Sequence, residues 1–141
     1  DFRRYTSLQI ARSTKPLNKS LTEVKPTMNL AVYGTLRTGS TNTGRINHTA
    51  LVFPGHQRFP AMICDRNGSG TIVEVHDVSD KTLAAYDDYE GLSASVYRRV
   101  RMDIVMDAGT IIEAWVYLAG EKLLEKSASF AVIPSGDWFN R

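Results

Sequence analysis

Two short segments carry the residues whose types and spacing suit chemistry, and the first is Tyr33-Gly34-Thr35-Leu36, which follows an apolar stretch. A glycine directly after a buried strand lets the backbone bend and expose successive N–H groups. Such groups form concavities that bind a carboxylate or a phosphate. The run lacks the Gly-Lys-Ser/Thr ending of a nucleotide-binding P-loop, so ATP or GTP hydrolysis is unsupported. An ordinary turn remains the alternative interpretation.

The second segment is Asp87-Asp88-Tyr89-Glu90-Gly91, which places three acids at the end of an expected helix. Carboxylates are unfavourable there because the helix dipole is negative at its C-terminus. This placement suggests that at least one acid has another task. If Glu90 is partly buried, its pKa rises toward the range that suits proton transfer. The alternative is a solvated acidic helix end.

Other nucleophiles and metal ligands are weakly supported. A Ser–His–Asp arrangement is conceivable from Ser40, His48 or His56, and Asp65, but no nucleophile-elbow motif is present. Cys64 lies in an apolar strand and is expected to be an inert core residue. A single cysteine and three scattered histidines argue against a disulfide framework or a metal site. We therefore expect no metal and no cofactor.

The composition is that of one globular domain, with 141 residues of which 43% are hydrophobic and 23% charged. No stretch approaches the roughly 20 apolar residues of a membrane-spanning helix, so no membrane insertion is expected. No secretory signal is visible. The compartment stays open, and an intracellular location or a place in a larger assembly is favoured.

The charge divides the chain into a basic arm and a slightly acidic body. Residues 1–27 hold six Lys or Arg against two acids, a net charge of +4, and residues 28–141 have a net charge of −2. The arm shows no sustained apolar period and contains Pro16 and Pro26. We expect an extended N-terminal arm over 1–27 that binds a protein partner or a second copy, and a domain over 28–141. A solvated tail is the alternative, and the charge is too sparse to favour nucleic-acid binding.

The body reads as short strands separated by turns. Strands are expected over 29–33, 49–53, 58–64 and 70–76. A helix follows between an N-cap at Ser79 and a stop at Gly91. Alternating residues over 100–106 and 111–118 predict an antiparallel hairpin, and a short helix is expected over 122–126. The predicted fold class is α+β, with a mostly antiparallel sheet that can curl into a barrel.

Five motifs occur in an order that resembles one family, the gamma-glutamylcyclotransferase-like superfamily, in particular its small gamma-glutamylamine cyclotransferase-like branch. The resemblance covers residues 28–141. The motifs are Tyr33-Gly34-Thr35-Leu36-Arg37, Asp87-x-x-Glu90-Gly91, Tyr97-Arg98-Arg99-Val100, Ala114-Trp115-Val116-Tyr117 and Ile133-Pro134-Ser135-Gly136-Asp137-Trp138.

The resemblance implies a small, mostly antiparallel mixed β-barrel with one or two short peripheral helices. It also implies a cavity in which Glu90 is the general acid/base, and the reaction converts a small γ-glutamyl compound to 5-oxoproline and an amine or peptide. The residues expected to bind the substrate are Tyr33, Gly34, Thr35, Leu36, Tyr97 and Tyr117. The alternative function is a non-enzymatic structural or assembly protein that binds a larger complex through its arm.

Overall fold

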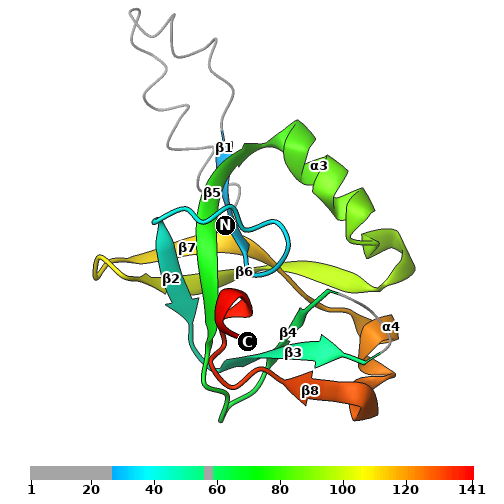
Figure 1. Ribbon diagram of the computed structural model, residues 1–141. Helices are drawn as coiled ribbons and strands as arrows, with labels where there is room; N and C mark the ends of the chain where they lie inside the picture. Colours follow the sequence, from blue (N-terminus) through cyan, green and yellow to red (C-terminus); the bar gives the residue numbers. More distant parts are fainter. Residues whose placement is uncertain (1–26, 56–58) are drawn as a thin grey trace, which may run out of the picture.

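A closed five-stranded barrel is the centre of the computed structural model, which describes residues 27–55 and 59–141 (Figure 1). Neighbouring strands follow the order β1-β5-β2-β6-β7. All pairs are antiparallel except β1 with β7, which run parallel and close the barrel. Its strands are β1 (Thr27–Val32), β2 (Thr43–Ile46), β5 (Thr71–Ser79), β6 (Tyr97–Met106) and β7 (Ile111–Ala119). The α+β class and the mixed barrel are confirmed.

A second, three-stranded antiparallel sheet with the order β4-β3-β8 lies against the barrel. Its strands are β3 (Thr49–Pro54), β4 (Ala61–Cys64) and β8 (Phe130–Val132). β2 and β8 are not predicted from the sequence, because their four and three residues are too short for a visible alternating pattern. Cys64 was expected in the core, and this is wrong. It is exposed, because it is the last residue of β4.

Within the described residues, two short helices, α3 (Asp80–Tyr89) and α4 (Glu121–Leu124), accompany the strands, with 3-10 turns at Leu92–Ala94, Ser127–Ser129 and Trp138–Asn140. The Ser79 side chain accepts a hydrogen bond from the Thr82 N–H, as its N-cap position predicts. Gly91 then ends α3 with a φ of 70°, which glycine adopts at little cost. Both ends of the helix are therefore fixed by local sequence.

The predicted hairpin forms as expected, and it separates two hydrophobic clusters. β6 and β7 pair from Tyr97 opposite Ala119 to Val105 opposite Ile111. Ala114, Val116 and Leu118 face one cluster, whereas Tyr117 and Ala119 face the other. The second cluster also receives Leu83 of α3 and Leu123 of α4. One face of β7 is thus turned toward the helices.

The arm predicted over 1–27 falls almost entirely outside the described residues, which begin at Thr27 in β1. Its binding to a partner chain, and the division of the chain at residue 27, remain predictions. Among the described helices, none is long and apolar enough to cross a membrane.

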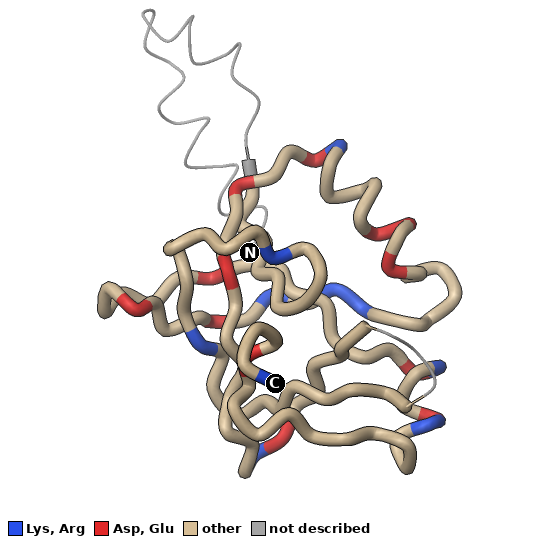
Figure 2. The backbone as a smooth tube through the Cα atoms, viewed as in Figure 1, with Lys and Arg blue, Asp and Glu red and all other residues tan. Residues whose placement is uncertain are grey.

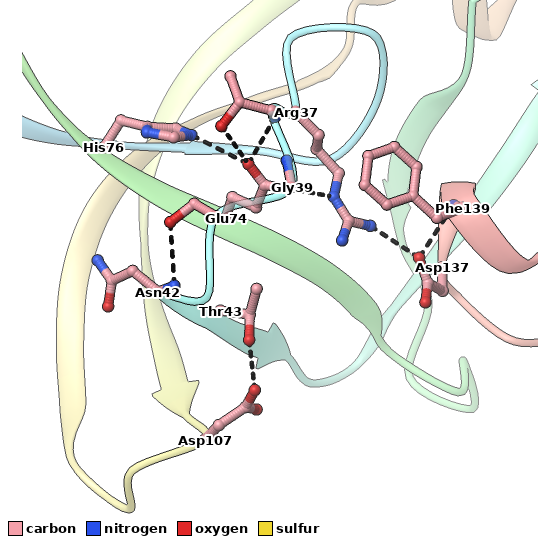
Figure 3. Close-up of polar contacts among 11 residues, drawn as sticks. Arg37, Gly39, Asn42, Thr43, Glu74, His76, Asp107, Asp137 and Phe139 are labelled. Carbon is pink, nitrogen blue, oxygen red and sulfur yellow. Dashed lines mark hydrogen bonds and ion pairs between the residues drawn. The ribbon is translucent and has the colours of Figure 1, made fainter.

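A buried carboxylate fastens the segment between β1 and β2. Glu74 of β5 is fully buried, and its oxygens accept hydrogen bonds from the N–H groups of Thr38 at 2.8 Å and Gly39 at 2.9 Å. Arg37 Nε donates to the same carboxylate at 3.0 Å, and His76 Nε2 lies 3.2 Å from it (Figure 3). Burial by itself raises the pKa of Glu74, but these donors outweigh it and lower the pKa to about 2.

The same arginine ties this segment to the C-terminal turn. Arg37 Nη1 donates to Asp137 Oδ1 at 2.7 Å, and the guanidinium lies 3.9 Å from the centre of the Phe139 ring (Figure 3). Asp137 also accepts from the Phe139 N–H at 3.0 Å. The segment that follows β1 is therefore held by β5 on one side and by the end of the chain on the other.

Glu74→Gln is expected to lower the free energy of unfolding at pH 7 by about 3 kcal/mol, because an amide cannot accept from all these donors and leaves the buried Arg37 with Asp137 as its one remaining carboxylate partner. Urea denaturation measures the change. The low pKa stabilises the fold above pH 4.5, and this contribution is lost as pH falls from about 4.5 toward about 2. The difference in free energy of unfolding between the wild type and Glu74→Gln therefore narrows as pH falls from about 4.5 toward about 2.

Glu113→Gln is the matched control, because Glu113 also pairs with an arginine, Arg101, at 2.8 Å but lies at the surface with 41% of its side chain exposed. Its expected cost is below about 1 kcal/mol. Equal costs for the two variants would show that burial of the Glu74 charge is not what holds this segment.

Candidate active site

A cavity of about 280 Å³ lies between the end of β1, the end of α3 and the start of the second sheet. Every residue predicted to form the site lines it: Tyr33, Gly34, Thr35, Leu36, Glu90, Tyr97 and Tyr117. The structure thus brings together residues up to 84 positions apart in the sequence, as the Tyr33–Tyr117 contact illustrates. Their roles in catalysis and binding remain predictions.

The segment Tyr33–Leu36 lines the cavity and leads through a tight turn over residues 34–37. The Arg37 N–H donates to the Gly34 carbonyl at 3.0 Å, which closes the turn. In the part of the chain that the structure describes, no hydrogen bond uses the N–H of Thr35 or Leu36. Since the next N–H groups are taken by Glu74, the turn keeps a fixed shape while these two stay available to an anion.

Glycine is needed at position 34 because the turn approaches the second sheet closely. A Cβ built there would stand 2.7 Å from Cγ of Pro60, well inside van der Waals contact. Pro60 is buried beside the cavity. A larger residue at position 34 would push the turn away from the wall it completes.

Glu90 is the titratable carboxyl of the cavity, and it stands at the C-cap of α3. Burial raises its pKa from 4.5 to about 7. At neutral pH the group therefore exists in both its protonated and its ionised form, which suits a residue that takes up and returns a proton.

Of the tyrosines that line the cavity, Tyr33, Tyr97 and Tyr117 use their hydroxyl groups in different hydrogen bonds. Tyr33 Oη donates to the Tyr117 carbonyl at 2.6 Å and accepts from the Met62 N–H at 3.2 Å. Tyr97 Oη donates to the Pro60 carbonyl at 2.8 Å. Burial raises the pKa of Tyr33 and Tyr117, so both phenols keep their protons at neutral pH. Tyr33 and Tyr97 hold β4 and its leading segment in place.

Tyr117 differs because its hydroxyl donates to a carboxylate, Asp87 Oδ1, at 2.8 Å. Asp87 also accepts two hydrogen bonds from the Arg99 guanidinium, at 2.8 Å from Nε and 3.0 Å from Nη2. Arg99 in turn lies 4.3 Å from the centre of the Trp115 ring. This polar cluster joins α3 to β6 and β7, and in Figure 2 acidic positions gather toward the end of α3 while basic positions lie on the neighbouring strand.

The cluster explains the acids that stand against the helix dipole. Asp87 is used to attach the helix to the barrel, and Glu90 faces the cavity. The first role is not predicted from the sequence, because it depends on a contact with Arg99, 12 positions away in the chain. Further residues that line the cavity were not predicted as site residues, although Tyr89 and Gly91 lie within the Asp87–Gly91 motif: Val32, Phe59, Pro60, Tyr89, Gly91 and Val96. Among the residues described, no group of three or more His, Cys, Asp or Glu is placed to bind a metal ion.

The chain is similar to known proteins in both sequence and fold. Residues 30–140 match the model of the family described as "Gamma-glutamyl cyclotransferase, AIG2-like". A protein of Methanocaldococcus jannaschii named "Putative gamma-glutamylcyclotransferase" is 31% identical over 100 residues, which cover 64% of this chain and 82% of that protein.

Solved structures of low sequence identity share the fold. An AIG2-like protein from Mus musculus superposes with a TM-score of 0.59 at 20% identity, over 70% of this chain and 83% of the other. An uncharacterised protein from Pyrococcus horikoshii has a TM-score of 0.55 at 24% identity, over 79% of this chain and 89% of the other. The barrel and its attached sheet are therefore a shared architecture.

The raised pKa of Glu90 predicts a pH-dependent stability. In the folded protein Glu90 keeps a proton that the unfolded chain releases near pH 4.5. The contribution of Glu90 to the free energy of unfolding is therefore fully present below about pH 4.5 and is lost as pH rises through about 7. Glu90→Gln has no such proton. Between pH 4.5 and pH 8, the free energy of unfolding of Glu90→Gln should therefore rise relative to that of the wild type by on the order of 1 kcal/mol. This value is reduced for the partial exposure of Glu90.

Thermal melting over this pH range measures the difference, with Asp88→Asn as the control on the exposed side of the same helix end. A constant gap between Glu90→Gln and the wild type at every pH would contradict the burial of Glu90.

Proposed function

Because the chain belongs to the gamma-glutamyl cyclotransferase, AIG2-like family, we propose that it converts a γ-glutamyl group to 5-oxoproline and releases an amine or a peptide. One observation carries the proposal. A single carboxyl group with a pKa near 7, Glu90, shares a small cavity with a turn whose N–H groups are available. A γ-glutamyl group carries an ammonium and a carboxylate on its α-carbon. The carboxyl group of Glu90 suits the ammonium, and the N–H groups of the turn suit the carboxylate.

Binding folds the substrate for attack on itself. The N–H groups of Thr35 and Leu36 receive the α-carboxylate, and Glu90 faces the α-ammonium. Holding both groups bends the glutamyl chain so that the α-nitrogen approaches the γ-carbonyl carbon, which makes the reaction intramolecular. The fixed shape of the turn, set by Glu74 and Arg37, means that little reorganisation is required on binding.

Glu90 is the one protein group that the proposed proton transfers require. Its carboxylate takes one proton from the α-ammonium, and the freed nitrogen lone pair forms a bond to the γ-carbon. The C–N bond to the leaving group then breaks, and the departing nitrogen receives the proton from Glu90 and a second proton from the attacking nitrogen. The products are 5-oxoproline and a protonated amine, and Glu90 returns to its ionised form. The substrate supplies the nucleophile, so the proposed mechanism requires no serine or cysteine nucleophile.

Glu90→Gln is expected to lower the rate of 5-oxoproline release by about 100-fold or more, because glutamine keeps the shape but takes up no proton at neutral pH. The assay uses a panel of L-γ-glutamyl amines and dipeptides, with 5-oxoproline quantified by mass spectrometry. In the wild type, kcat/KM should rise with pH and reach half its maximum near pH 7, the pKa of Glu90.

Asp88→Asn serves as the control and should keep its rate within about twofold, since Asp88 is an exposed neighbour outside the cavity. Undiminished turnover in Glu90→Gln would remove Glu90 from the mechanism. Wild-type protein that releases no 5-oxoproline from any member of the panel would contradict the proposed function and favour the non-enzymatic alternative.

A further inference from the structure

A second groove, separate from the candidate active site, lies between the start of β1, helix α3 and the β6–β7 hairpin. Its volume is about 290 Å³, and it shares no lining residue with the cavity described above. Its apolar lining comes from β1, α3 and β7, through Met28, Leu83, Ala84 and Trp115. Two aspartates of α3 and Arg99 complete it. The groove therefore offers both apolar surface and carboxylates.

Helix α3 is incompletely covered on the side of this groove. Of its ten residues, only Leu83 is buried. Met28 and Trp115 pack against the same hydrophobic cluster as Leu83 but are only partly buried, and Ala84 is exposed. A segment lying over these side chains removes their apolar surface from water, which favours its binding in proportion to the area covered.

The described chain enters the fold beside this groove. Thr27, the first residue of β1, pairs with Ser79, which directly precedes α3 and caps it (Figure 1). Residues 17–26 come immediately before Thr27, and ten residues span about 33–36 Å when extended. Helix α3, with ten residues, is about 15 Å long. The chain's own arm is therefore long enough to follow the groove, and its attachment at Thr27 keeps it at a high local concentration there.

The helix beside the groove is acidic. Asp80–Tyr89 contains three aspartates and one lysine, a net charge of −2, and Figure 2 shows the acidic positions along α3. Asp87 is paired with Arg99. Within residues 27–55 and 59–141, neither Asp80 nor Asp88 forms an ion pair. Asp80 lines the groove, so a basic segment in the groove meets a carboxylate that no described residue neutralises.

Residues 17–26 have the side chains that such a groove requires. The segment reads Leu-Asn-Lys-Ser-Leu-Thr-Glu-Val-Lys-Pro. It provides three apolar residues, Leu17, Leu21 and Val24, and its two lysines outnumber its one acid. The arm as a whole, over 1–27, has a net charge of +4, opposite in sign to that of α3. Complementary charge of this kind draws the arm toward the helix.

We propose that residues 17–26 of the chain's own arm occupy this groove, with their apolar side chains against Met28, Leu83 and Trp115 and their lysines toward the acids of α3. The contact attaches α3 to the barrel on the side where the helix is least covered. It uses no residue that lines the candidate active site, so it is independent of the proposed function. The segment also precedes residue 30, where the match to the family begins.

Site-specific photo-cross-linking in the full chain tests where the arm lies. Leu21 or Val24 is replaced by the photoreactive amino acid p-benzoylphenylalanine, and mass spectrometry identifies the residues that it captures on irradiation. We expect capture within residues 80–84 of α3 or at Trp115, in a product with the mass of a single chain. Thermal melting checks that each variant is folded.

Two neighbouring alanines of α3 provide a matched pair of variants. Both are exposed, but Ala84 lines the groove and Ala85 does not. Ala84→Arg should lower the cross-link yield about fivefold or more, because the arginine fills the groove and repels the lysines of the arm. Ala85→Arg adds the same charge to the same helix outside the groove and should leave the yield within about twofold.

A cross-link that joins two chains, a capture site elsewhere on the body, or no capture from either position would overturn the inference. The first of these results would assign the groove to the arm of a second copy, in line with the partner expected from the sequence. Equal yields in Ala84→Arg and Ala85→Arg would also overturn it, since the arm then lies outside the groove. Release of 5-oxoproline tests the proposed function separately, and none of these results decides it.

Discussion

The burial of one negative charge governs how this molecule is arranged around its cavity. Glu74 is completely enclosed within the barrel wall, and an enclosed carboxylate is tolerated only when donors surround it. Those donors come from the segment after β1 and from Arg37, which reaches on to Asp137 near the end of the chain. The requirement to satisfy Glu74 therefore fixes the turn, and the turn shapes the cavity.

A second polar anchor acts on the opposite wall. α3 buries only Leu83, so apolar packing alone holds it weakly. Asp87 adds an ion pair with Arg99 and a hydrogen bond from Tyr117, and these attach the end of the helix to β6 and β7. Asp87 and Glu90, three residues apart, thus have different roles. Asp87 stays paired with Arg99, whereas Glu90 lies at an apolar cavity and has its pKa raised.

The cavity consequently lies where three independently fixed parts meet: a turn held by Glu74, a helix end held by Asp87, and a second sheet held through the hydroxyl groups of Tyr33 and Tyr97. Each part is secured away from the space that a substrate would occupy. This arrangement leaves Glu90, Thr35, Leu36 and Tyr117 along the cavity. Preorganisation of this kind is what the cyclisation proposed above requires.

The sequence by itself determined most of the local elements and the motifs from which the site is predicted. Ser79 and Gly91 mark the ends of α3 because capping is a local interaction, and alternation predicts the β6–β7 hairpin because one face is buried. The motifs identified part of the cavity lining, from Tyr33–Leu36 and Glu90 to Tyr97 and Tyr117. Only the tertiary structure decided which donors surround Glu74, that Asp87 meets Arg99 and Tyr117, and that short strands such as β2 and β8 pair at all. These depend on contacts between residues 12 to 100 positions apart, whose geometry no local pattern records, and whose energy arises only when folding excludes water from them.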